Sequence, residues 1–199
     1  SVYWTTMLMA LDIPLPRTLF ATGWILNKDS AKMSKSKGDV VNPLDLAAQV
    51  GLDELRYFLV RDVHMGNDAP FSMELVSGRV NSELANNLGN LLSRSTNLVE
   101  KFFAGKRPPF AADDAASTEL KGKVLELPAR VKAEVEAFRP SYALEQIVGV
   151  LSAANKYLEE KAPWKTAKEN LTEAGHVLAT TLEVLRVTGT LLLPVMPVK

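Results

Sequence analysis

The hydrophobic positions follow a helical period from residue 73 to the end of the chain. The first such stretch, residues 73–103, predicts one long helix whose apolar stripe faces inward. That stripe consists of Leu84, Leu88, Leu91, Leu92, Leu98 and Val99. The later helical patterns cover residues 118–137, 142–161, 163–168 and 172–193. Because consecutive helices with short connections pack against each other, we expect a mainly α fold with an antiparallel helical bundle.

Two details of this bundle depend on single residues. Pro128 lies inside the second pattern, and we expect it to kink or divide that helix because proline has no backbone N–H to donate. Thr172 is the expected N-cap of the last helix, since threonine hydroxyls accept hydrogen bonds from the free N–H groups of a first turn.

The first part of the chain has a different pattern. Residues 2–11 are apolar on most faces and stop at the prolines of "DIPLP", which predicts a buried helix followed by a turn. The next segment, "RTLFATGWIL", is rich in β-branched and aromatic residues and predicts a strand. A helix followed by a strand is typical of a layered α/β domain, in which we expect Trp4 and Trp24 to pack. Its partner strands would lie outside this chain, unless the segment folds differently here.

Between these parts, residues 42–60 predict two short helices. Asn42 followed by Pro43 is a typical cap and first turn, and Asp53 is the expected cap of the second helix. The apolar face of that second helix holds Leu55, Phe58 and Leu59. The next stretch, "HMGNDAPFS", predicts a loop by its composition.

The composition is that of a folded globular protein. Apolar residues make up 47% and charged residues 23%, which excludes wholesale disorder. Lys and Arg equal Asp and Glu at 23 each, so a nucleic-acid partner must meet a local basic patch. The absence of cysteine excludes disulfides and thiolate zinc sites. No apolar run reaches membrane-spanning length, so we expect no membrane partner and a cytoplasmic protein.

A cluster of lysines is the strongest local charge. Lys28, Lys32, Lys35 and Lys37 fall within ten residues and repel one another unless solvent, a phosphate-rich ligand or RNA lies against them. Flexible ammonium groups can follow charge that develops on phosphate oxygens, and the small neighbouring residues let the backbone approach. A solvated cationic turn is the alternative.

Four motifs resemble one enzyme family. Lys32-Met33-Ser34-Lys35-Ser36 matches the signature loop of class I aminoacyl-tRNA synthetases. The stretches "YWTTMLMALDIPLP", "FSMELVSGRVNSELANNLGNLLSR" and "NKYLEEKAPWKTAKE" resemble the methionyl-tRNA synthetases, in the family's order and over nearly the whole chain. The resemblance implies that the five loop residues bind ATP and that Lys32 and Lys35 are catalytic, with Lys35 the first candidate for contact with the transition state and Lys32 the second.

The resemblance also implies an organisation and a reaction. Residues 1–44 would be the end of a Rossmann-like α/β catalytic domain, residues 45–72 a module that contacts the tRNA stem, and residues 73–199 the anticodon-binding bundle. The enzyme would join methionine to tRNA(Met) with ATP and Mg²⁺. The family's His-Ile-Gly-His motif, amino-acid pocket and zinc-bearing insertion do not occur here. We therefore expect a C-terminal part that is inactive alone, with any zinc upstream.

A second candidate site lies in the predicted bundle. Asn86, Asn90 and Arg94 are four residues apart and share one stripe of the long helix, and Trp164 follows a proline at a helix start. Amides and guanidinium groups can read base edges while an aromatic ring stacks on an unpaired base. Spacing alone equally allows a packing tryptophan and interhelix asparagines. The resemblance implies that Asn90, Arg94 and Trp164 contact the CAU anticodon.

Some alternatives and departures stay open. Another class I synthetase, leucyl or cysteinyl, shares the loop and a helical bundle, and a non-catalytic RNA-binding bundle is the rival from another class. Thr22 stands where the family usually has histidine. His64 and His176 lack the spacing of metal ligands, so we expect structural roles and no metal site. The oligomeric state is not predicted.

Overall fold

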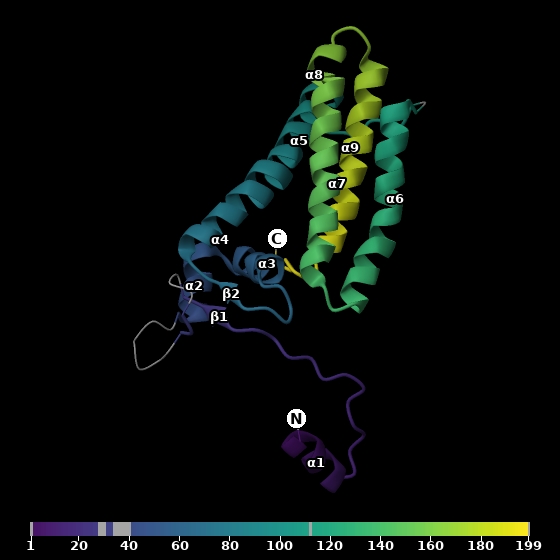
Figure 1. The fold of residues 1–199 in the computed structure, drawn as a ribbon. Coiled ribbons are helices and arrows are strands. Elements are labelled where there is room, and N and C mark those ends of the chain that lie inside the picture. Colours follow the sequence, from purple (N-terminus) through teal and green to yellow (C-terminus); the bar gives the residue numbers. More distant parts are fainter. Residues whose placement is uncertain (1, 28–30, 34–40, 112, 199) are drawn as a thin grey trace.

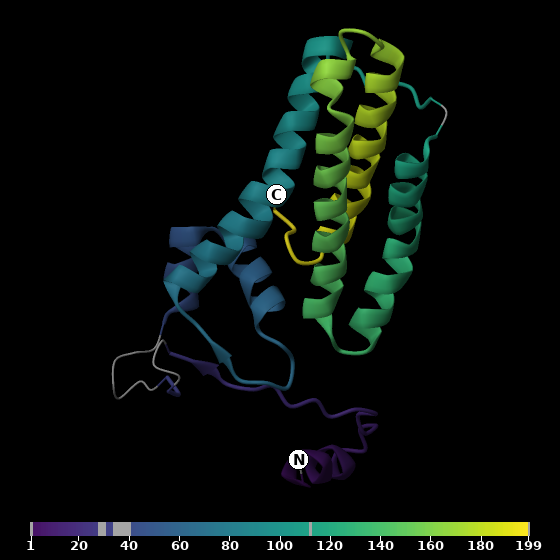
Figure 2. The same cartoon turned by 45° about the horizontal axis from the view of Figure 1, so that its top comes forward.

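The computed structural model describes residues 2–27, 31–33, 41–111 and 113–198. Long helices lie side by side at one end of the molecule, and short helices with a small sheet lie at the other (Figures 1 and 2). This arrangement confirms the predicted mainly α fold with a helical bundle. Within the described ranges, no helix is both long and apolar enough to cross a membrane.

Long helices with one shared core make up the bundle. They are α5 (Asn90–Phe103), α6 (Ala115–Glu136), α7 (Pro140–Lys161) and α9 (Leu171–Leu192), with the short α8 (Pro163–Thr166) between the last two. Leu91, Leu127, Ile147, Leu158 and Leu178 are fully buried where these helices meet. Burying one such side chain contributes about 1.5–3 kcal/mol, so this shared core holds the helices together.

The helix α6 is longer and more continuous than the sequence predicts. Asp114 accepts a hydrogen bond from Ser117 N at 2.8 Å, and Ser117 Oγ accepts one from Asp114 N at 2.9 Å, so a capping box starts the helix at Ala115. Of the two outcomes expected at Pro128, a kink or a division, the division does not occur, because α6 runs undivided through this residue. Leu127, the residue before Pro128, is fully buried. This packing holds the helix in place although Pro128 has no backbone N–H to donate to the preceding turn.

Two predicted helix caps are wrong. Asn170, not Thr172, caps α9, and its Oδ1 accepts a hydrogen bond from Glu173 N at 3.1 Å. Asp53 does not cap α3 (Leu52–Asp62); its buried carboxylate accepts a hydrogen bond from Val198 N at 3.1 Å. For α9, a neighbouring side chain, Asn170, takes the capping position in place of Thr172. For α3, the Asp53 carboxylate bonds to a donor far along the chain instead of to its own helix, and sequence spacing does not reveal such a donor.

The long helix predicted over residues 73–103 is confirmed as three consecutive segments with a π-helical middle. These are α4 (Met73–Arg79), η2 (Val80–Gly89) and α5. Leu91 and Val99 are buried as predicted, and Leu84, Leu88 and Leu98 pack against the core. The inward assignment of Leu92 is wrong, since this residue is 48% exposed. A π-helical turn holds more residues than an α-helical turn, which rotates the following side chains away from the predicted stripe.

A second, smaller core forms under the short helices. The predicted cap of α2 (Pro43–Val50) is confirmed, since Asn42 Oδ1 accepts a hydrogen bond from Leu44 N at 3.0 Å. Apolar side chains of α2, α3 and α4 meet around Phe58 in a separate cluster. Its buried members are Leu46, Leu55, Phe58, Phe71 and Val76. The predicted apolar face of α3 is thereby confirmed, with Leu59 packed at the edge of the cluster.

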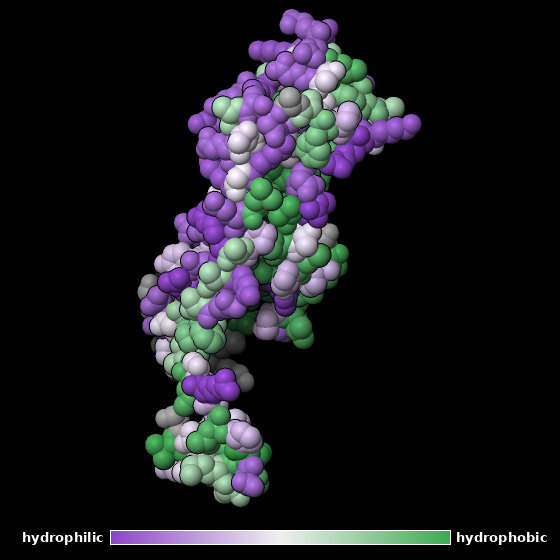
Figure 3. All heavy atoms as spheres, turned by 90° about the vertical axis from the view of Figure 1, so that its right-hand side faces the viewer, coloured by the Kyte–Doolittle hydropathy of each residue, from purple (hydrophilic) through white to green (hydrophobic). Residues whose placement is uncertain are grey.

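The N-terminal part is less packed than predicted. The strand β1 covers only Ile25–Leu26 and pairs in parallel with β2 (Ala69–Pro70) inside the predicted loop, so a partner strand expected outside this chain lies within it. The helix α1 (Val2–Ala10) forms as predicted but buries none of its residues, and apolar side chains gather over it in Figure 3. Trp4 and Trp24, expected to pack, are 57% and 59% exposed. A two-strand sheet offers no second layer against which they could be buried.

A polar network joins α3 to the long helix. Glu83 accepts hydrogen bonds from Tyr57 Oη at 2.6 Å, Arg79 Nη1 at 2.7 Å and Arg61 Nε at 3.2 Å. Arg79 also donates to both oxygens of Asp62, at 2.8 and 2.9 Å. Burial and the bond to Glu83 raise the pKa of Tyr57 well above its ordinary value, so the phenol stays a donor. The network therefore fixes the angle at which the long helix leaves α3.

The end of the chain also contacts α3 (Figure 1). Arg56 donates from Nε to Val195 O at 2.7 Å and from Nη2 to Pro194 O at 2.9 Å. Together with the bond from Val198 N to Asp53, these contacts anchor residues 194–198 on the helix. The helix α3 thus contacts the long helix and the last residues at the same time.

Candidate nucleic-acid interface and lysine loop

Arg94 and Trp164, predicted to share a site, lie together in the structure. Arg94 Cζ is 5.0 Å from the centre of the Trp164 ring, although 70 residues separate them in sequence. Ala162 has a left-handed backbone (φ 43°) that ends α7, and Pro163 then starts α8. This sharp turn brings Trp164 back against α5. Trp164 packs against the bundle core and is partly buried.

A carboxylate that the sequence analysis did not predict completes this group. Arg94 Nη2 donates to Glu159 Oε2 at 2.7 Å, with the two side chains 39% and 66% exposed. The guanidinium thus contacts an aromatic face and a carboxylate together, which restricts its orientation without burying it. Glu159 lies five residues before Trp164 in the motif "NKYLEEKAPW", and this position was the sequence signal that could have indicated its contact with the site.

The asparagines of the long helix divide into two sets. Asn86 and Asn90, eight and four residues before Arg94, are both exposed. Asn87 instead faces α7: its Nδ2 donates to Ser152 Oγ at 2.9 Å, and its Oδ1 accepts from Asn155 Nδ2 at 2.7 Å. The Asn87 pair, which sequence reasoning missed, fixes the rotation of the helix. Asn86 and Asn90 are thus exposed to solvent, and Arg94 is the residue of this set with a contact to Trp164 in the structure.

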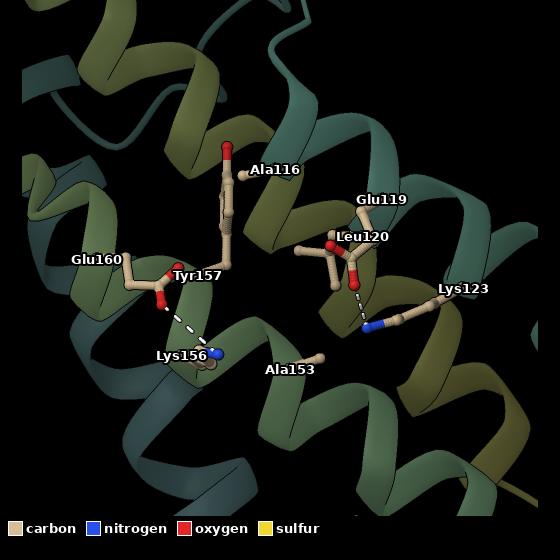
Figure 4. A pocket seen from close by; sticks show the side chains of 8 residues that line it. All are labelled: Ala116, Glu119, Leu120, Lys123, Ala153, Lys156, Tyr157 and Glu160. Carbon is tan, nitrogen blue, oxygen red and sulfur yellow. Dashed lines mark hydrogen bonds and ion pairs between the residues drawn. The ribbon is translucent and has the colours of Figure 1, made fainter.

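A hollow of about 110 Å³ between α6 and α7 is a poor candidate site (Figure 4). Its charged lining is paired, with Lys123 Nζ 2.6 Å from Glu119 and Lys156 Nζ 3.7 Å from Glu160. Paired charges leave no net field for an anion. Burial raises the pKa of the lining Tyr157 to about 12, so this phenol stays neutral near pH 7.

The signature loop of residues 32–36, called the lysine loop below, is described only at Lys32 and Met33. Lys32 Nζ lies 3.5 Å from the centre of the Trp24 ring, and Met33 packs at the edge of the small core. Across the described ranges, Lys32 forms no ion pair with a carboxylate. Ser34, Lys35 and Ser36 lie outside the described residues. The structure thus brings an exposed cation to the base of the loop.

The two histidines have partners within the fold. His64 Nδ1 lies 2.8 Å from Ser141 Oγ, and His176 Nδ1 accepts a hydrogen bond from Ala111 N at 3.0 Å. The part of the chain that the structure describes holds no cluster of three or more His, Asp or Glu suited to a metal ion. No protein ligand for Mg²⁺ is therefore assigned. Nothing in the structure explains Thr22.

Comparisons with known proteins cover almost the whole chain. Residues 1–96 match the family of tRNA synthetases class I (M), and residues 108–199 match the anticodon binding domain of methionyl tRNA ligase. Methionine–tRNA ligase of Clostridium acetobutylicum is 40% identical over 99% of this chain, and methionine–tRNA ligase 1 of Bacillus cereus is 43% identical over 100% of it. The chain spans 31% and 30% of these relatives' lengths.

A solved structure agrees with this relationship. Mycobacterium tuberculosis methionyl-tRNA synthetase bound by methionyl-adenylate superposes with a TM-score of 0.93 at 39% sequence identity. The match covers 99% of this chain and 39% of that one. The likeness therefore includes the bundle, the short helices and the N-terminal part together.

Proposed function

Because this chain belongs to the methionyl-tRNA synthetase family of class I enzymes, we propose that it serves a methionine–tRNA ligase in two ways. The bundle recognises the CAU anticodon of tRNA(Met), and the lysine loop grips the phosphates of ATP. The parent reaction first forms methionyl-adenylate and pyrophosphate from methionine and ATP, and then transfers methionine to the terminal ribose of the tRNA. Cytoplasm is the proposed compartment.

The observation that carries the RNA part is the guanidinium of Arg94 against the ring of Trp164, 5.0 Å from its centre. An unpaired base can stack on the accessible part of this indole, while Arg94 and Asn90 donate hydrogen bonds to its edges. RNA must compete with the exposed carboxylate of Glu159 for the Arg94 guanidinium, and such an exposed pair is weak enough to be displaced. The stripe of Asn86 and Asn90 continues the same polar surface.

The phosphate part rests on Lys32 and, outside the described residues, on Lys35. Pyrophosphate departure builds negative charge on oxygens, and a lysine ammonium stabilises such charge without a fixed geometry. Met33, Ser34 and Ser36 would complete the ATP contact. Mg²⁺ would arrive on the ATP phosphates and neutralise part of their charge. We further propose the division into residues 1–44, 45–72 and 73–199 for catalysis, stem contact and anticodon binding.

The test is binding of a fluorescent anticodon stem-loop of tRNA(Met), followed by anisotropy. The unmodified chain should bind it, and a single base change in CAU should abolish binding. Trp164→Ala should weaken binding by about 5- to 150-fold, because stacking contributes about 1–3 kcal/mol per base. Arg94→Ala should weaken it as well. Equal affinity for CAU and for a changed triplet would refute the proposal.

Matched controls separate the site from general charge and aromatic effects. Trp4→Ala removes an exposed tryptophan of α1, and Arg130→Ala removes an exposed arginine of α6. Both variants should bind the stem-loop as the unmodified chain does. If Arg130→Ala weakened binding as much as Arg94→Ala, the RNA contact would be non-specific charge attraction.

A further inference from the structure

We propose that Trp24 is a positioning residue for Lys32. Its indole face holds the Lys32 ammonium at the start of the lysine loop. A phosphate anion can bind the ammonium there and displace it from the ring. The phosphate half of this inference rests on the proposed function of Lys32. The tryptophan half rests on contacts among described residues alone.

The backbone brings the two side chains together. Leu26 pairs with Lys32 in an antiparallel bridge, Asn27 N donates to Ala31 O at 2.8 Å, and Ala31 N donates to Asn27 Oδ1 at 2.9 Å. Trp24 precedes Leu26 by two residues, so its side chain leaves the same face of the strand. Lys32 is its diagonal neighbour across the pair, a position that long side chains can reach. The 3.5 Å distance from Nζ to the ring centre follows from this register.

The backbone of Trp24 is fixed from both sides. Its N–H donates to Asp68 Oδ1 at 2.7 Å, and its carbonyl accepts from Ala69 N at 2.9 Å. The preceding residue must be glycine, because a Cβ on Gly23 would lie 2.0 Å from Asn67 O. The close approach of residues 23 and 67 thus holds the strand against the β2 segment. This anchoring orients an indole that is 59% exposed and belongs to neither core cluster of the described residues.

An aromatic partner differs from a carboxylate in one respect that matters here. A carboxylate would neutralise Lys32, whereas an indole orients the ammonium and leaves its full positive charge. The base of the loop therefore still attracts anions. An exposed contact of this kind shifts the population of the held lysine by only about two- to fivefold, so a phosphate group can displace the ring.

The experiment is NMR of the whole chain labelled with ¹³C at the lysine ε carbons, with the Lys32 signal assigned by Lys32→Arg. An ammonium over a ring face lies in the shielding region, so the Lys32 signal should be displaced upfield of the other lysines. Trp24→Ala should remove the displacement, and Trp24→Phe should restore part of it. Trp4→Ala is the matched control, an equally exposed tryptophan, and should leave the signal unchanged.

Inorganic pyrophosphate at millimolar concentration is the probe for the exchange. It should move the Lys32 signal to its undisplaced position, and Trp24→Ala should bind pyrophosphate about two- to fivefold more tightly because the competing ring is gone. A Lys32 signal that is insensitive to Trp24→Ala overturns the inference. A displacement that persists with pyrophosphate also overturns it. Neither of these two outcomes affects the stem-loop assay, which tests the proposed anticodon recognition independently.

Discussion

The substitution Glu83→Ala tests whether the junction network determines stability. Glu83 is 9% exposed and accepts hydrogen bonds from Tyr57, Arg61 and Arg79. Removing one partner of a buried ion pair costs about 3–5 kcal/mol, because the remaining charge stays buried without compensation. Arg79 keeps both bonds to Asp62, which leaves Arg61 as the principal unpaired cation. We therefore expect a loss near the lower limit, about 3 kcal/mol.

Urea unfolding followed by circular dichroism measures this loss. Tyr57→Phe removes one hydrogen bond to a charged acceptor and should cost about 1.5–3 kcal/mol or slightly less, since Glu83 keeps its two arginines. The double variant should cost less than the sum of the single ones, because the residues share one network. Glu126→Gln, an exposed carboxylate of α6, is the matched control and should stay within about 0.5 kcal/mol. A cost below about 1 kcal/mol for Glu83→Ala would refute the reasoning.

Three further predictions follow from the electrostatics and the motifs. The bond from Lys161 lowers the pKa of the Asp114 carboxyl, so its stabilising contribution is present above the ordinary value of 3.8 and is lost as the pH falls below it. Asp114→Asn should flatten the decline of stability between about pH 4 and pH 2, measured by thermal unfolding; an unchanged slope would contradict this. Glu159→Gln should strengthen stem-loop binding by about two- to fivefold, because Arg94 loses an exposed competing carboxylate, and weaker binding would contradict it. The 199-residue chain should show no methionine-dependent pyrophosphate exchange, since it has no His-Ile-Gly-His motif, and measurable exchange would disprove this.

The period of apolar residues predicted the bundle well because helix burial is a local signal. Leu91 and Val99 are buried as their spacing indicated, and the Asn42 cap forms as expected. Leu92 was misassigned because the π-helical segment before it depends on contacts such as Asn87 with Asn155, which no local pattern encodes. Asp53 was misassigned because its donor, Val198, lies 145 residues away.

Less of the candidate site could be predicted from the sequence. Spacing placed Asn90 and Arg94 on one stripe, but only the family resemblance connected them with Trp164. The ion pair of Arg94 with Glu159 depends on how α5 and α7 pack, so the motif containing Glu159 gave its position and not its role. Trp24 was expected in a core, and its contact with Lys32 became visible only through the strand register.

The attachment of residues 194–198 to α3 has a consequence for how the protein matures on the ribosome. Arg56 is made 138 and 139 residues before its partners Pro194 and Val195, and Asp53 is made 145 residues before Val198. Contacts between such distant positions form late, because a long loop must close before they yield any stabilisation. The nascent α3 therefore waits for the synthesis of residues 194–198 before its final contacts form.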